Sequence, residues 1–258
     1  ARTIAQSITE KSGHTVIIEN KEGAGSLIGT MAVAKAAPDG YTILIAANPL
    51  VIVPSQNLKP PYDPAKDFIP IVKIGVIPLV LAVTPSLKIN TVKELVAYAK
   101  ANPGKLTYGS NGEGGFPHLW FEDLAKRAGI TFTHIPYKGA TQIATDLISG
   151  QIMAAGDGVS AMTPFIKANQ LTLLNVTNLT RVSQYPNVPT VSETVPNFVA
   201  NGDFGFAAPA NTPSEIIKKL NAAINGAVES PEVVERLPGL GLVGIAQSPE
   251  YFEAIFKR

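Results

Sequence analysis

A glycine-rich run between a predicted strand and a predicted helix constrains this chain more than any other feature. Residues 108–115 have the sequence YGSNGEGG and separate a strand at 105–108 from a helix at 116–128. Such a loop aims unpaired backbone N–H groups at one point, where the positive end of the helix dipole favours an anion. The alternative is that the glycines only form a tight turn.

A second loop of the same kind follows at 136–139, between a strand at 131–135 and a helix at 140–149. A third strand at 151–155 completes the order strand, helix, strand, helix, strand. This order predicts a parallel sheet with right-handed crossovers, in which ligands bind beyond the carboxyl ends of the strands. Two helix N-termini at one sheet edge suit a small anion with carboxylate-like groups.

The composition excludes several classes of function. The 258 residues are enough for two lobes, and 21 Lys plus Arg against 20 Asp plus Glu give a net charge of +1. This balance offers no general attraction to nucleic acid, which we do not expect as a partner. The chain has no cysteine, which excludes disulfides and thiol-based catalysis or metal sites. No uninterrupted apolar run approaches the roughly 20 residues of a membrane span. We expect no metal and no cofactor.

The rest of the chain alternates helices and strands. We predict helices at 1–11, 26–37, 91–100 (with a Thr91–Glu94 capping box), 159–168 and 213–229, and strands at 15–19, 41–46, 69–74, 78–83, 171–176 and 204–208. The strand at 41–46 is nearly all apolar, which predicts burial on both faces. Prolines 54, 60, 61 and 64 predict a loop, and a short αβα tail ends the chain. We assign 1–83 to a first lobe, 84–203 to a second lobe, and 204–258 to a return to the first.

A series of motifs along the chain is similar to one known family. The motifs are VIIENKEGAG (16–25) with Ile28-Gly29, AAPDGYT (36–42), YGS (108–110) with His118-Leu119, PYKG (136–139), Asp146-Leu147 with Gly150-Gln151, VPTV (188–191), and APA (208–210) with Thr212-Pro213. In order and spacing they resemble the Bug family, the periplasmic solute receptors of tripartite tricarboxylate transporters. The resemblance covers essentially the whole chain.

The resemblance implies an α/β, two-lobed, type II periplasmic-binding-protein fold with the ligand cleft between the lobes. It implies capture of a small organic carboxylate by hinge closure, transfer to membrane permease subunits, a periplasmic location, and action as a monomer. Family members begin with one more strand and a ligand-holding loop, so we expect a signal peptide and that strand to precede residue 1. Members often carry serine in place of Gly115, an aromatic residue in place of Gly156, and Trp in place of Phe204, which leaves the identity of the carboxylate open.

Ten residues are candidates for ligand binding: Ala47, Asn48, Ser110, Asn111, Gly112, Gly114, Tyr137, Lys138, Gly139 and Asp157. Several have two open roles. Ser110 is either a hydroxyl donor to the ligand or a turn serine bonded to its own backbone. Tyr137 covers the ligand or supplies a hydroxyl, and Lys138 is a counter-ion or a solvated loop lysine. Asp157 is a helix N-cap or a cleft residue that holds a water or an ammonium group.

Two other functions remain as alternatives. An α/β hydrolase would use Ser110 and His118, but the chain lacks the Gly-x-Ser-x-Gly elbow, and His118 is expected to pack or hydrogen-bond locally. The effector-sensing half of a transcription regulator is the second alternative. His14 and His134 are interpreted as isolated, without metal-ligand spacing.

Overall fold

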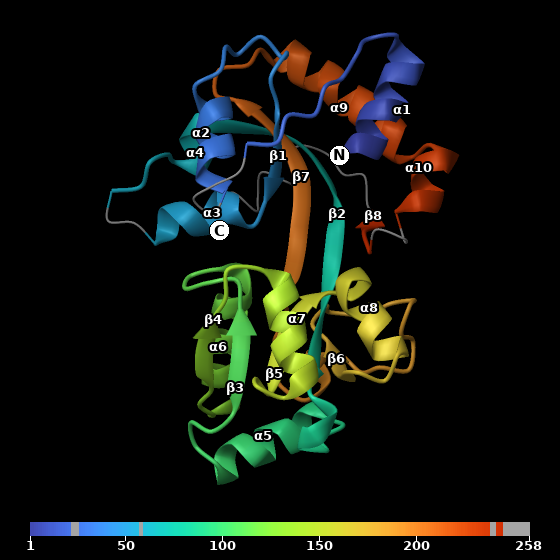
Figure 1. Cartoon of the computed structure of the whole chain (residues 1–258). Helices are drawn as coiled ribbons and strands as arrows, with labels where there is room; N and C mark the ends of the chain where they lie inside the picture. The colour runs from blue at the N-terminus through green and yellow to red at the C-terminus, as the bar shows by residue number, and fades with distance from the viewer. Residues whose placement is uncertain (22–25, 57–58, 238–240, 245–258) are drawn as a thin grey trace. The chain divides into compact units, whose positions relative to one another are not determined.

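The computed structural model describes residues 1–21, 26–56, 59–237 and 241–244 (Figure 1). The chain divides into two compact units, one within residues 1–76 and 203–258 and the other at 77–202. It therefore passes from one unit to the other twice, within strands β2 (Phe68–Val83) and β7 (Asn201–Pro209). The predicted divisions fall after residues 83 and 203, whereas the structure divides after 76 and 202.

The helices of the first unit come from two parts of the sequence, one before β2 and the other after β7. Its other described elements are α1 (Arg2–Ser12), α2 (Leu27–Ala34), β1 (Leu44–Ala47), α3 (Pro49–Ser55), α4 (Pro64–Asp67), α9 (Ser214–Val228), α10 (Pro231–Arg236) and β8 (Val243–Gly244). β1 pairs antiparallel with β7, and β8 pairs antiparallel with β2 at Gly75 and Val76. One core cluster joins Ile4 of α1 to Ile224 and Val228 of α9, so helices from opposite ends of the sequence pack together.

Three predictions for the first unit are wrong. No strand forms at 15–19, where Ile17 is 83% exposed, because β-branched residues form a strand only beside a partner strand. The strand predicted at 41–46 is shorter and only partly buried, since β1 stands at the end of the strand order and Tyr41 is exposed. The predicted proline loop contains α3 and α4, and Pro64 occupies the first turn of α4, where its missing N–H costs nothing. The glycine entrance predicted at 23–25 lies outside the described residues.

The second unit is built on a mixed sheet. Its elements are the second half of β2, the 3₁₀ turn η2 (Pro85–Leu87), α5 (Val92–Ala101), β3 (Thr107–Ser110), α6 (Phe116–Ala128), β4 (Thr133–Pro136), α7 (Ala140–Ser149), β5 (Ala154–Gly158), α8 (Val159–Lys167), β6 (Thr172–Val176) and the 3₁₀ turn η3 (Val191–Glu193). β3 pairs parallel with β4 and with β5, as predicted. β2 pairs antiparallel with β5 and with β6, so the sheet as a whole is mixed.

Helices cover both faces of this sheet, and the strand side chains show it. Along β2, Leu79, Leu81 and Val83 join the core cluster under α5 and α6, whereas Val80 and Ala82 join the cluster under α7 and α8. Successive side chains of a strand point to opposite faces, so a strand covered on both sides is apolar throughout. We call the two sides the α6 face and the α7/α8 face.

The helix boundaries of the second unit are close to those predicted. The Thr91–Glu94 capping box begins α5, and Gly129 and Gly150 end α6 and α7 in the left-handed conformation that glycine adopts freely. The strands predicted at 69–74 and 78–83 are one strand, β2, which continues through Gly75 and Pro78. Those two residues flank the point where the chain enters the second unit.

Candidate functional site

The glycine-rich loop after β3 is bonded largely to itself. The Ser110 hydroxyl donates to the Gly112 carbonyl at 3.0 Å and accepts from the Gly112 N–H at 3.2 Å. Gly114 N–H donates to His118 Nδ1 at 2.8 Å, and Gly115 N–H donates to the Gly112 carbonyl at 3.3 Å. The prediction of unpaired N–H groups is therefore wrong for these three glycines. Gly112 and Gly114 have φ of +112° and +70°, values that glycine adopts more readily than other residues.

A pair of stacked histidines lies behind this loop on the α6 face. The ring centroids of His118 and His134 are 4.2 Å apart, and Tyr108 stacks on His134 at 5.0 Å. His134 Nε2 lies 2.6 Å from Ser110 Oγ, and Ser110 is fully buried. Burial first, and then the neighbouring His118, lower the pKa of His134. His134 of this stack thus hydrogen-bonds the Ser110 hydroxyl in the protein interior.

The interpretation of His134 as isolated is wrong, whereas the expectation that His118 bonds locally is confirmed. The parallel register of β3 and β4 carried the missing signal. Tyr108 pairs with His134 and Ser110 pairs with Pro136, which makes Ser110 and His134 diagonal neighbours on one face.

The second loop contributes a tyrosine whose hydroxyl is already bonded. Tyr137 Oη donates to Asp146 Oδ2 at 2.7 Å, and burial together with this bond raises the pKa of Tyr137 to about 12. Its ring packs in the cluster under α7 and α8. Lys138 is exposed, and Gly139 is the N-cap of α7. Each loop therefore ends at a helix N-terminus, the first at the thirteen-residue α6 and the second at the ten-residue α7.

Asp157 lies at the end of β5, not at a helix N-cap. The N-cap of α8 is Gly158, whose N–H donates to Asp157 Oδ1 at 2.7 Å. The N-cap interpretation of Asp157 is therefore wrong, because the strand continues to the residue before the helix. Burial raises the pKa of this carboxyl group, and the bond from Gly158 only partly offsets that shift.

Ala47 and Asn48 belong to the first unit. Ala47 is the last residue of β1, and Asn48 is the N-cap of α3. Asn48 Oδ1 accepts a hydrogen bond from Asp203 N–H at 2.8 Å, and the Asp203 carboxylate pairs with Lys73 Nζ at 2.6 Å. The Asn48 amide is thereby oriented by β7, one of the two linking strands.

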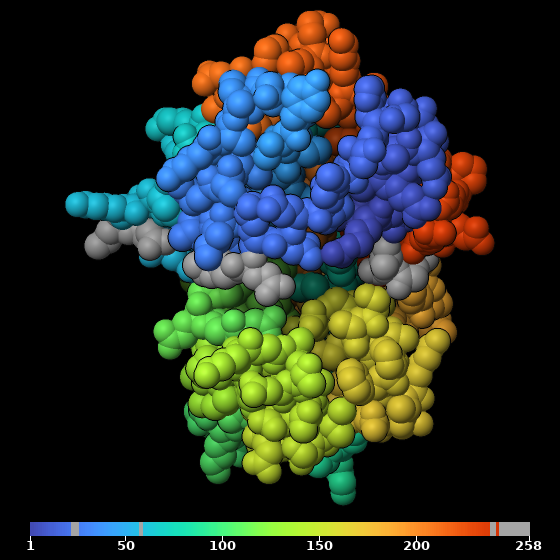
Figure 2. Space-filling view, turned by 45° about the horizontal axis from the view of Figure 1, so that its top comes forward, coloured from blue at the N-terminus to red at the C-terminus, as the bar shows by residue number. Residues whose placement is uncertain are grey.

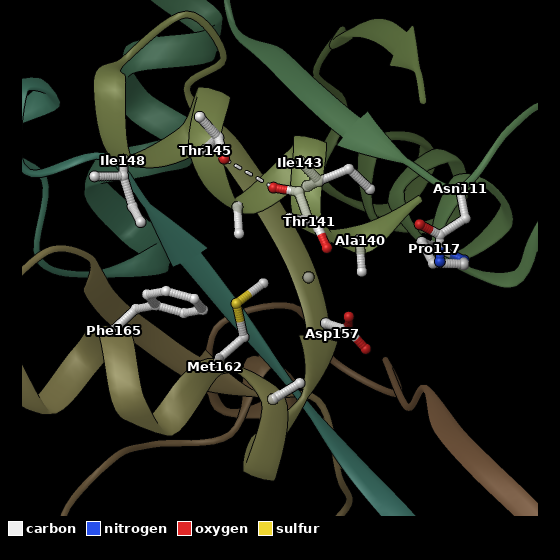
Figure 3. A pocket seen from close by; sticks show the side chains of 13 residues that line it. Asn111, Pro117, Ala140, Thr141, Ile143, Thr145, Ile148, Asp157, Met162 and Phe165 are labelled. Atoms are coloured by element: carbon white, nitrogen blue, oxygen red, sulfur yellow. Dashed lines mark hydrogen bonds between the residues drawn. The ribbon is translucent and has the colours of Figure 1, made fainter. Parts of the chain in front are cut away.

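A hollow of about 330 Å³ opens on the α7/α8 face of the second unit (Figure 3). It is lined by Asn111, Pro117, Ala140, Thr141, Ile143, Ala144, Thr145, Ile148, Gly156, Asp157, Ala161, Met162 and Phe165. Two of the ten candidates, Asn111 and Asp157, line it. Its apolar walls come from α7 and α8, and none of their lining residues is among the ten candidates.

The other side of β5 is closed by an aromatic ring. A Cβ at Gly156 would lie 2.0 Å from Trp120 Cζ2 of α6 and 3.0 Å from the backbone carbonyl of Val80. The Trp120 ring, which is 3% exposed, therefore occupies the place of a side chain at position 156. β5 separates the closed α6 face from the hollow.

Comparison with known proteins shows the family of this chain. A family model described as "Tripartite tricarboxylate transporter family receptor" matches residues 1–251. The chain belongs to this family.

Individual relatives agree over nearly the whole chain. Protein BugT of Bordetella pertussis is 35% identical over 253 residues, which are 97% of this chain and 78% of BugT. The structure of R. palustris Rpa4515 with adipate is 31% identical with a TM-score of 0.87, over 99% of this chain and 86% of the other. MatC of Rhodopseudomonas palustris with bound malate is 26% identical with a TM-score of 0.83, over 100% and 89% of the two chains.

This receptor is therefore a solute-binding protein with the predicted two-lobed periplasmic-binding-protein fold, and not an enzyme. The hydrolase alternative also lacks its geometry, because the Ser110 hydroxyl is buried and bonds His134 instead of His118. Among the residues that the structure describes, no helix is both long and apolar enough to cross a membrane, and no three His, Asp or Glu side chains form a metal site.

Proposed function

We propose that this receptor binds a small organic carboxylate in the periplasm and delivers it to the membrane permease subunits of a tripartite tricarboxylate transporter. Membership of the receptor family carries the proposal. The two ligand-bound relatives support the chemistry, since one holds adipate and the other malate.

The ligand carboxylate would bind at the carboxyl ends of the strands of the second unit. Asn111 lies there beside Ala140 and Thr141, the first two residues of α7. The first N–H groups of a helix have no partner within the helix, and its dipole favours an anion at that end. None of the described residues that line the hollow is Lys or Arg, so N–H groups, the Asn111 amide and the Thr141 hydroxyl would meet the ligand charge.

The remaining candidates take supporting roles in this proposal. Ser110, Gly112 and Gly114 shape the first loop, and Tyr137 fixes the second through Asp146. Gly139 lets the chain enter α7 without a side chain beside the ligand. Asn48 and Ala47 would be further ligand-binding residues, and Lys138 would add a solvated positive charge.

Binding would work by a change in the open and closed populations of a monomer. The chain passes between the two units within β2 and β7, and a ligand that binds the closed state more tightly than the open state shifts the population toward it by that differential affinity. Light scattering of the purified protein would measure the monomeric state.

Isothermal titration calorimetry with mono-, di- and tricarboxylates tests the proposed function. At least one acid should bind, and at 100 times its dissociation constant it should stabilise the fold by about 2.7 kcal/mol. Asn111→Ala should weaken that binding by about tenfold through the loss of a hydrogen bond to a charged group, whereas Lys138→Ala should have a smaller effect. Binding of sugars or nucleotides with no response to any acid would reject the carboxylate assignment.

A further inference from the structure

The hollow on the α7/α8 face has a polar end and an apolar end. Figure 3 shows Asn111 and Asp157 at one end and Ile148 and Phe165 at the other, with Met162 on the side of α8. In the space-filling view, α7 (yellow-green) and α8 (yellow) lie side by side on the surface of the second unit (Figure 2). A volume of about 330 Å³ is at the lower end of the range for small-molecule sites.

The apolar end is built from packed side chains. Met162 is 4% exposed, and Ile148 and Phe165 are half-buried against the same core cluster. Ala144 and Ala161 keep the two helices from filling the space with larger groups. The walls are therefore fixed by the core beneath them and present hydrocarbon surface to an occupant.

The charge of the lining disfavours a second ionised group. Among the lining residues that the structure describes, Asp157 is the one ionisable residue, and none is Lys, Arg or His. A second anionic group of the ligand at the apolar end would have no counter-charge there, and an unpaired charge removed from water is costly. A hydrocarbon group would gain about fourfold in affinity for each methylene that it buries.

We propose that the hollow between α7 and α8 holds the hydrocarbon body of the ligand, while the ligand carboxylate binds at the Asn111 and Thr141 end. This inference rests on the proposed function and names its substrate class. The preferred ligands are monocarboxylates with an aliphatic or aromatic body, ahead of short di- and tricarboxylates.

Calorimetry with acetate, butanoate, hexanoate, octanoate and 4-phenylbutanoate, against malate and citrate, tests the substrate class. Affinity should rise about fourfold per methylene along the straight-chain series until the hollow is full. Hexanoate, octanoate or 4-phenylbutanoate should bind more tightly than malate and citrate. A flat series, or tighter binding of malate or citrate, would overturn the inference.

A substitution that fills the hollow tests whether the hydrocarbon body of the ligand binds there. Ala144→Phe should weaken octanoate and 4-phenylbutanoate at least tenfold and leave acetate within about twofold. Ala222→Phe makes the same change on an exposed site of α9 in the first unit and should leave every affinity unchanged. Phe165→Ala is the second variant, to be used if Ala144→Phe does not fold. It removes part of the wall and should also weaken the binding of the longer acids selectively.

The outcomes separate the two proposals. If no carboxylate binds the wild-type protein, the proposed function fails and this inference fails with it. If carboxylates bind but neither Ala144→Phe nor Phe165→Ala changes the ratio of long to short acids, the receptor function stands and the hollow is not its specificity site.

Discussion

In the second unit, helices cover both faces of the sheet, but one face is closed by internal bonding and packing and the other face has a hollow. On the α6 face, the hydroxyl of the candidate Ser110 is hydrogen-bonded to His134, and His118, which was expected to bond locally, accepts from Gly114 N–H and stacks on His134. On the α7/α8 face, ordinary helix core residues leave a hollow beside Asn111 and Asp157. Polar side chains at a loop therefore do not by themselves mark where a ligand binds. A polar group is available to a ligand only when its neighbours leave it unbonded.

Among the substitutions that test this comparison, we expect the largest effect from Gly156→Ala, which adds a methyl group toward the closed α6 face. Because the added Cβ would overlap the rigid Trp120 ring, we expect the free energy of unfolding to fall by about 3 kcal/mol. Chemical denaturation measures it. Gly226→Ala in α9, where a Cβ would meet nothing within 4 Å, should leave stability unchanged or slightly higher. An equal loss in both variants would remove the special role of position 156.

Ser110→Ala tests whether the serine serves the fold or the ligand. Its removal leaves His134 Nε2 and the Gly112 N–H without their partner, so the free energy of unfolding should fall by about 1–3 kcal/mol. Ser183→Ala, at an exposed serine, is the matched control. A stability equal to wild type, combined with lost carboxylate binding, would return Ser110 to the role of a ligand donor.

Acid should weaken the α6 face. The pKa of His134 is lowered from 6.5 in the folded state, so the unfolded state takes up the proton first. The stabilising contribution of neutral His134 is therefore complete above about pH 6.5 and is lost as the pH falls through the lowered pKa. Melting temperature measured from pH 7 to pH 4.5 should fall more steeply for wild type than for His134→Gln. Parallel curves would mean that other groups cause the decline.

Acid should have the opposite effect beside the hollow. The pKa of Asp157 is raised above 3.8 by burial, so the folded state holds its proton at a higher pH than the unfolded state. Ionised Asp157 destabilises the fold once the pH exceeds the raised pKa. Asp157→Asn should thus melt higher than wild type at pH 7, by a margin smaller than the Ser110 effect, and the margin should shrink toward pH 4. A variant that melts lower at pH 7 would show that the charge has a partner.

Much of the local structure could be predicted because its causes are local. The capping box at Thr91, the left-handed glycines at 129 and 150, and the apolar spacing of α7 depend on residues within a few positions of each other. The parallel order of β3, β4 and β5 follows from the helices between them. The family resemblance added the two-lobed fold.

Several of the failed predictions required knowledge of a partner distant in sequence. The segment 15–19 has strand-forming residues but no strand beside it, and His134 was interpreted as isolated until its register with β3 placed it on Ser110. The continuity of β2 depends on neighbours that pair with each of its halves.

The sequence by itself determined the order of helices and strands from β3 to α8 in the second unit, the two glycine loops and the family of this receptor. Only the tertiary structure decided which polar groups are bonded internally, that Trp120 fills the place beside Gly156, and that α7 and α8 leave a hollow between them. Helix caps and amphipathic spacing are set by near neighbours in the chain. The availability of a hydrogen-bonding group and the space between two helices are set by atoms that only the folded packing brings together.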